Sequence, residues 1–260
     1  MKHNPPFSAT YIGGPTVIFE IGGLRLMTDP TLDEAGSFLK LNEYMTETKL
    51  KGPAMIPPGF VDVVLLSHDH HFDNLDNAGR SFLTQTGVVL TTRSGAERLG
   101  ANSIGLSPGE SREFQIPGGG KLVITATPAR HGPAGIEPIT GEVIGFHISI
   151  QNEITQSVYI TGDTVYYNEI EKLAAQINPS YVFIFAGAAR PRGPFNLTMS
   201  TNDALDTADA FKSAMIVPVH SEGWSHYTEN NDNLREAFNI LGIGNRLLLL
   251  EPGVPTRLFN

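Results

Sequence analysis

The ten residues 67–76 carry the densest set of metal-binding side chains in the sequence. They contain three histidines, His68, His70 and His71, and three aspartates, and they follow directly after an apolar run at residues 61–66. Imidazole nitrogen and carboxylate oxygen are ligand atoms for zinc, manganese and iron in proteins. A short apolar run that ends at a turn predicts a buried strand. The stretch therefore predicts a metal site at the end of a strand, where ligands are placed more accurately than on a free loop.

Four further ligand-type side chains also follow apolar runs that predict strands. They are Asp29 after residues 24–27, His131 after residues 122–126, Asp163 after residues 157–161, and His220 after residues 214–219. A single histidine in such a place is more often a hydrogen-bonded core residue than a ligand. Five strand ends that each carry histidine or aspartate are difficult to attribute to chance, so we expect them to converge on one site.

The elements that position these residues follow from apolar periodicity and turn signals. Strands are predicted over residues 16–21, 24–27, 61–66, 88–92, 113–116, 122–126, 143–150, 157–161, 181–185, 214–219 and 247–250, and helices over residues 74–86, 94–99, 167–176, 201–213 and 229–241. Residues 31–60 predict an irregular excursion that covers the site. The first half of the chain consists mostly of strands joined by hairpins, and in the second half strands and helices alternate. This pattern indicates two layered sheets with helices on their outer faces.

The order of these motifs resembles the metallo-β-lactamase superfamily, in particular the branch of the ascorbate-phosphate lactonase and N-acyl-phosphatidylethanolamine phospholipase D. The resemblance spans roughly residues 10–226. The motifs that carry it are Asp29-Pro30, the histidine-rich stretch, His131, Gly162-Asp163-Thr164 and His220. It implies an α/β fold built as a four-layer αββα sandwich.

The resemblance also implies two adjacent positions for divalent metal ions, with one or two ions of zinc or manganese bound. The first position would be held by His68, His70 and His131, the second by Asp73 and His220, with Asp163 bridging the two. Asp29 would orient a ligand histidine from behind rather than bind metal itself.

The histidine-rich stretch departs from the family motif His-x-His-x-Asp-His. One inserted residue reconciles both ends of the motif, and it leaves His71 as a competitor of His70 for the second histidine position. Asn74 stands where the motif has its last histidine, and a carboxamide oxygen is a weaker zinc ligand than imidazole. The second metal position is therefore the part of the site that the sequence leaves open.

Two accessory features suit a substrate. His226 lies six residues after His220 and could bind substrate or protonate a leaving group. Arg190 and Arg192 could bind a phosphate or carboxylate, although loop arginines are more often solvated charges. We therefore name Asp73 and His226 as catalytic candidates, and Arg190 and His226 as substrate-binding candidates.

Composition narrows the class of partner. The formal net charge is −9 and no cluster of lysine and arginine is visible, which disfavours nucleic acid as a partner. The chain has no cysteine, so thiolate ligands and disulfides are excluded. No apolar run approaches the roughly 20 residues of a membrane helix, and residues 1–6 lack a signal peptide's apolar stretch. We expect a cytoplasmic protein, with one domain over residues 1–260 and no membrane partner.

These features together predict an enzyme that uses a metal-bound hydroxide to hydrolyse a small-molecule ester, lactone or phosphodiester. The alternative is a non-catalytic metal-binding or ligand-sensing protein on the same fold, which Asn74 in place of a histidine would favour.

Overall fold

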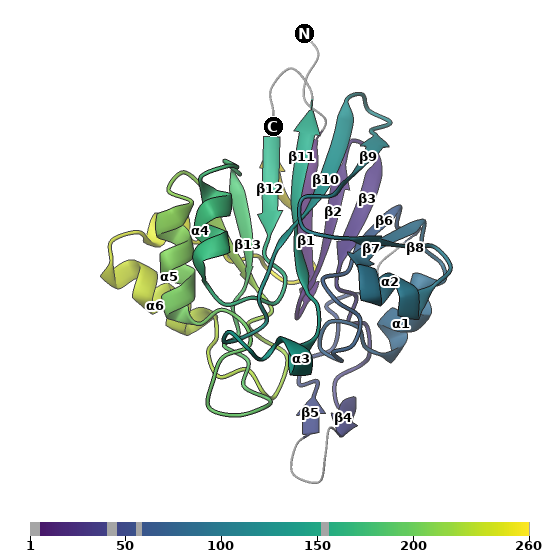
Figure 1. Cartoon of the computed structure of the whole chain (residues 1–260). Helices are drawn as coiled ribbons and strands as arrows, with labels where there is room; N and C mark the ends of the chain where they lie inside the picture. Colours follow the sequence, from purple (N-terminus) through teal and green to yellow (C-terminus); the bar gives the residue numbers. More distant parts are fainter. Residues whose placement is uncertain (1–5, 41–45, 56–58, 152–155, 260) are drawn as a thin grey trace.

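Two mixed β-sheets face each other and carry helices on their outer faces (Figure 1). The computed structural model describes residues 6–40, 46–55, 59–151 and 156–259. This arrangement confirms the predicted four-layer αββα sandwich. None of the helices within those ranges is long and apolar enough to cross a membrane.

The first sheet has seven strands in the order β15-β1-β2-β3-β6-β7-β8. Their bounds are β1 Phe7–Gly13, β2 Thr16–Ile21, β3 Leu24–Thr28, β6 Val63–Leu65, β7 Val88–Thr92, β8 Ser103–Leu106 and β15 Thr256–Phe259. The hairpin between β2 and β3 turns at Gly22 and Gly23, whose φ angles of 54° and 99° favour glycine. The two strands that it joins were predicted at residues 16–21 and 24–27.

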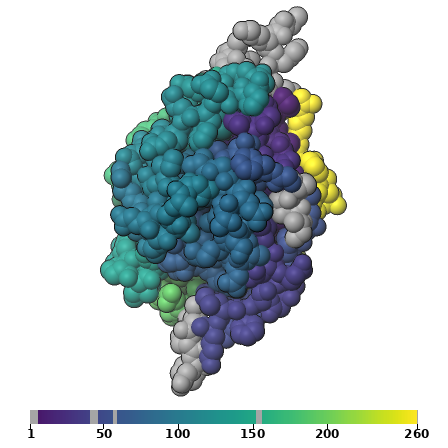
Figure 2. Space-filling view, turned by 90° about the vertical axis from the view of Figure 1, so that its right-hand side faces the viewer, coloured from purple at the N-terminus to yellow at the C-terminus, as the bar shows by residue number. Residues whose placement is uncertain are grey.

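The second sheet has six strands in the order β14-β13-β12-β11-β10-β9. Their bounds are β9 Ser111–Gln115, β10 Lys121–Pro128, β11 Ile144–Gln151, β12 Gln156–Ile160, β13 Tyr181–Phe185 and β14 Met215–Val219. A separate hairpin, β4 Phe38–Lys40 and β5 Thr46–Thr48, projects beyond the sheets at one end of the molecule (Figures 1 and 2).

The helices cover the outer faces of the two sheets. Helices α1 Asn77–Leu83 and α2 Arg93–Leu99 lie on the first sheet, and α4 Asn168–Ala174, α5 Thr201–Ala210 and α6 Asn231–Ile240 lie on the second (Figure 1). The short α3 Glu137–Thr140 lies near the lower end of the sheets in that view. Figure 2 looks onto the face that carries α1 and α2, with β15 beside β1 at its edge.

Alternation along the strands divides the core into three layers. In β13, Phe183 and Phe185 face the other sheet, whereas Val182 and Ile184 pack under the helices. Successive side chains of a strand point to opposite faces, so a strand buried on both sides reads as a continuous apolar run. The second sheet can therefore serve two cores, and its strand ends are held rigidly.

Most predicted elements are present with shifts of a few residues at their ends. The strand predicted at residues 247–250 is wrong, because that run makes only an isolated bridge from Leu247 to Ile216. The last strand is instead β15, which pairs antiparallel with β1.

Candidate metal centre

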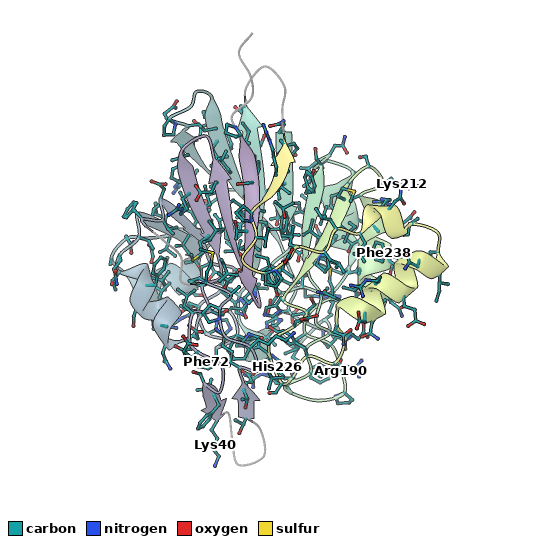
Figure 3. All side chains as sticks on the ribbon, turned by 180° about the vertical axis from the view of Figure 1, so that it is seen from behind. Lys40, Phe72, Arg190, Lys212, His226 and Phe238 are labelled. Carbon is teal, nitrogen blue, oxygen red and sulfur yellow. The ribbon has the colours of Figure 1, made fainter. Side chains whose placement is uncertain are left out.

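The predicted strand-end residues meet at one edge of the two sheets. Strands β3 and β6 run parallel, as do β12, β13 and β14, so their carboxyl ends lie at the same edge. Asp29, Asp163 and His220 each follow such an end, and His131 follows β10, which runs in the same direction as β12 because both pair antiparallel with β11. Figure 3 shows His226 at this edge, between Phe72 and Arg190 and remote from Phe238 in the helical layer.

Four side chains form a compact group of ligand-type atoms. His68, His71, His131 and Asp163 each offer one atom, and these atoms lie within 4.8 Å of one another. Nδ1 of His71 lies 3.0 Å from Nε2 of His68 and 2.9 Å from Nε2 of His131. Oδ2 of Asp163 lies 3.4 Å from Nε2 of His131 and 3.8 Å from Nε2 of His68.

These distances fit a tetrahedral metal ion. Four ligands at about 2.0–2.1 Å from a zinc ion lie roughly 3.3 Å from one another, because a tetrahedron's edge is about 1.6 times its centre-to-corner distance. Four of the six separations, 2.9–3.8 Å, bracket that value, and all six lie within 4.8 Å. Three imidazoles and one carboxylate are also a donor set that zinc or manganese accepts.

Hydrogen bonds behind two of the histidines set which ring nitrogen is free. Nδ1 of His131 lies 2.8 Å from the carbonyl oxygen of Leu197, which can only accept, so the proton sits on Nδ1 and Nε2 keeps its lone pair. Nδ1 of His68 lies 2.9 Å from Oγ of Ser67, and this hydroxyl donates to Oδ1 of Asp29 at 2.7 Å. Asp29 thus orients His68 through Ser67, which is the kind of role predicted for it.

The two competing histidines lie in different places. His71 lies in the group, whereas His70, which we expected there, lies outside it with Nε2 bonded to the carbonyl oxygen of Thr140. The carbonyl oxygen of His71 accepts from the backbone N–H groups of Asn74 and Leu75, and this turn directs the His71 ring inward. The geometry therefore favours His71 over His70 for the second histidine position.

A second group of polar side chains adjoins the first and shares Asp163 with it. Nε2 of His220 lies 3.3 Å from Oδ2 of Asp73, and Nδ1 of His220 lies 3.6 Å from Oδ1 of Asp163. Asp163 thus turns one oxygen toward each group, as a bridging carboxylate must. Oδ2 of Asp73 also lies 2.8 Å from Nε2 of His226 and 3.4 Å from the hydroxyl of Tyr227.

His220 carries two signs of a functional constraint. Its φ of 54° lies in the left-handed region, which costs a non-glycine residue about 1–3 kcal/mol. Within the described part of the chain, neither of its buried ring nitrogens has a hydrogen-bond partner. Each nitrogen instead faces a carboxylate at ion-pair distance, 3.3 Å to Asp73 and 3.6 Å to Asp163, and imidazole with carboxylates is a donor set that suits a divalent cation.

The two groups differ in electrostatics. Burial lowers the pKa of His68 and of His71 well below the ordinary value, and neighbouring imidazoles lower it further, so both rings are neutral and ready to ligate. Burial also opposes the charge on His220, but Asp163 and Asp73 outweigh it and raise its pKa to about 9. Metal binding at His220 would therefore release a proton.

The structure adds residues that the sequence did not single out. Glu47 on β5 is buried and lines a small cavity together with His71, Asp73, His131 and His226. The cavity, of about 10 Å³, holds about one water molecule. Burial raises the pKa of Glu47 to about 7, and the Asp73 carboxylate adds to this. No sequence signal marked Glu47, because β5 has only three residues and lies in the stretch predicted to be irregular.

The two loop arginines lie in different places. Arg192 lines the small cavity beside the ligand-type atoms. Arg190, the substrate-binding candidate, is exposed, is absent from the lining of that cavity, and bonds Oδ1 of Asn196 at 2.6 Å. The proximity to the site that we expected of Arg190 thus belongs to Arg192, while the substrate role of Arg190 stays a prediction.

Comparison with known proteins agrees with this geometry. The model of the beta-lactamase superfamily domain matches residues 25–221. A UPF0173 metal-dependent hydrolase of Pelotomaculum thermopropionicum is 31% identical over 171 residues, 63% of this chain and 68% of its own. An N-acyl-phosphatidylethanolamine-hydrolyzing phospholipase D of Caenorhabditis elegans is 24% identical over 88% of this chain and 68% of its own.

The fold has a counterpart among solved structures. The crystal structure of an isothiocyanate hydrolase from Delia radicum gut bacteria superposes with a TM-score of 0.82 and 23% identity, over 97% of this chain and 100% of that one. Fold, ligand geometry and family match thus agree. The chain belongs to the metallo-β-lactamase superfamily, within its UPF0173 branch of metal-dependent hydrolases, and is a distant homologue of the phospholipase D.

Proposed function

We propose that the protein hydrolyses a small-molecule ester, lactone or phosphodiester with one or two bound divalent ions, zinc or manganese. The observation that carries this proposal is the group formed by His68, His71, His131 and Asp163, with the Asp73 and His220 group beside it. Divalent ions bound there would supply a water whose pKa falls from 15.7 to about 7 and would stabilise developing negative charge.

The residues of the chain supply orientation and exclusion of bulk water. Ser67 and Leu197 fix the rings of His68 and His131, so that their Nε2 atoms point at one place. Asp73 is only 5% exposed, and Asp163 only 1%, so these carboxylates act in a dry environment where electrostatic effects are strong. The small cavity between them has room for about one water, the nucleophile of a hydrolysis.

A second cavity supports a small substrate. It has a volume of about 280 Å³ and shares His131 with the small cavity. Leu106, Pro108, Val143 and Ile144 give it apolar walls. Two arginines and two glutamates add charges of both signs, namely Arg93, Arg130, Glu137 and Glu142. This volume lies just below the roughly 300–1,000 Å³ typical of ligand pockets, which favours a compact substrate.

The test is hydrolysis of a substrate panel by protein loaded with zinc or manganese. The panel holds an aryl ester, a lactone, a phosphodiester and, because of the structural neighbour, an aryl isothiocyanate. We expect saturable hydrolysis of at least one compound, its loss on chelation and its return with metal. His71→Ala should abolish activity, whereas the neighbouring His70→Ala should retain it. No hydrolysis by a metal-loaded, folded protein would refute the proposal.

A further inference from the structure

His226 lies beside the second group of ligand-type atoms, at the point where the family motif is incomplete. Its Nε2 is 2.8 Å from Oδ2 of Asp73, and Nε2 of His220 is 3.3 Å from the same oxygen. The His226 side chain is only 7% exposed. One carboxylate oxygen of Asp73 thus lies within hydrogen-bond or ion-pair distance of two imidazole nitrogens.

Residues on both sides hold His226 in this position. The backbone N–H of Ser225 donates to the carbonyl oxygen of Thr48, and the N–H of Thr48 donates to the Ser225 hydroxyl, both at 3.0 Å. The carbonyl oxygen of His226 accepts from the N–H of Arg190 at 3.1 Å. The loop is therefore anchored to β5 on one side and to the segment after β13 on the other, as a preorganised ligand requires.

Asn74 cannot supply what the family's histidine would supply. Its Nδ2 donates to Oδ1 of Asp163 at 3.2 Å, so the side chain is oriented by the shared carboxylate. Its Oδ1 is buried and has no hydrogen-bond partner in the described part of the chain. A carboxamide oxygen is a poorer ligand for zinc than an imidazole nitrogen. The second metal position therefore lacks one imidazole ligand of the family motif, and His226 lies beside Asp73 at this position.

We propose that His226 is a ligand of the second metal position, with Asp73, Asp163 and His220, and takes over the place that Asn74 has lost. The separation of 3.3 Å between His220 and Asp73 matches the roughly 3.3 Å expected between two ligands of one tetrahedral ion, and at 2.8 Å from Asp73 the Nε2 of His226 is within a small movement of that value. A ligating Nε2 has no proton to give, so this assignment replaces the proton transfer predicted from the sequence. The inference rests on the metal-dependent function proposed above.

The simpler alternative is that Nε2–H of His226 only donates a hydrogen bond to Asp73 and orients it. The two readings differ in what a glutamine at this position does. His226→Gln can still donate a hydrogen bond, but it offers no imidazole, so it should lose the second ion if His226 is a ligand. If His226 is only a donor, the glutamine variant should keep the ion.

The experiment measures metal content rather than activity. Metal-free protein is loaded with excess zinc, dialysed and analysed by mass spectrometry for ions per chain, and a cobalt-loaded sample gives the visible spectrum of each position. We expect two ions for the wild type and one for His226→Ala and His226→Gln. Removal of a direct ligand should lower the affinity for the second ion by more than the roughly 10–100-fold that is lost when a hydrogen-bond partner of a ligand is removed. The double variant Asn74→His/His226→Ala should regain the second ion.

Three results would overturn the assignment. They are one ion in the wild type, two ions in His226→Gln with an unchanged cobalt spectrum, or a double variant that stays at one ion. Circular dichroism shows that each variant is folded before its metal is counted. Because the first position does not involve His226, hydrolysis with one ion could stand if this inference failed, whereas a wild type that binds no ion would defeat both proposals.

Discussion

Removal of the Ser67 hydroxyl should weaken metal binding without touching a ligand. In the structure this hydroxyl accepts from Nδ1 of His68 at 2.9 Å and donates to Oδ1 of Asp29 at 2.7 Å. Ser67→Ala breaks both contacts and leaves the Nδ1–H of a fully buried His68 without an acceptor. Asp29 loses less, because the backbone N–H of Ser67 still donates to it at 2.9 Å.

The magnitude follows from the one buried donor left unsatisfied. A buried donor without an acceptor destabilises the structure by about 1–3 kcal/mol. This corresponds to a roughly 5–150-fold change in a binding constant, at about 1.4 kcal/mol per factor of ten. Measured losses for the hydrogen-bond partners of metal-ligating histidines, about 10–100-fold, fall in the same range. We therefore expect Ser67→Ala to weaken the first zinc ion by about 10–100-fold.

The assay is competition for zinc against a coloured chelator, with circular dichroism as the check on folding. Ser81→Ala is the matched control, since that hydroxyl donates to the carbonyl oxygen of Asn77 on an exposed helix face at 3.0 Å. The control should bind zinc as the wild type does. A zinc affinity of folded Ser67→Ala within twofold of the wild type would show that the relay from Asp29 does not orient His68.

Three further perturbations test the fold around the site. Lys49→Met should lower the free energy of unfolding by about 3 kcal/mol in urea, since it strands the buried Asp76, although three backbone N–H groups still bond that carboxylate. Gly145→Ala should lower it by about 1–3 kcal/mol, because the new Cβ would lie 2.5 Å from Oγ1 of Thr127 and 2.6 Å from two backbone oxygens; an unchanged urea midpoint would contradict this. Burial lowers the pKa of His147, so the unfolded chain binds its proton more readily and stability falls as pH drops below about 6.5. The urea midpoint of His147→Gln should fall less between pH 7 and pH 5 than that of the wild type.

Local signals were sufficient for most of the fold. Strand β13 was predicted with its observed bounds, because an apolar run between polar turns leaves little freedom. The run at residues 247–250 is as apolar as β13, but it pairs with a neighbouring strand through a single bridge only. Strand β15 has a partner in β1, almost the whole chain away. Pairing between distant segments decides such cases, and periodicity carries no information about it.

The site shows the same division between local and distant information. The order of ligand types along the sequence predicted which strand ends meet. It left the choice between His70 and His71 open, because the positions of the two rings depend on a turn after His71 and on a contact of His70 with Thr140, which is far away in the sequence. Glu47 reaches the site from a three-residue strand with no sequence signature.

Backbone strain marks the site independently of any motif. In the described part of the chain, four residues other than glycine have positive φ, and two of them are Asp29 and His220. Each follows a strand and must turn its side chain toward the meeting point of the sheets. A glycine would remove the cost of about 1–3 kcal/mol but would also remove the carboxylate or the imidazole. The strain persists because the site requires the carboxylate and the imidazole at these two positions, even though a relaxed backbone there would make the fold more stable.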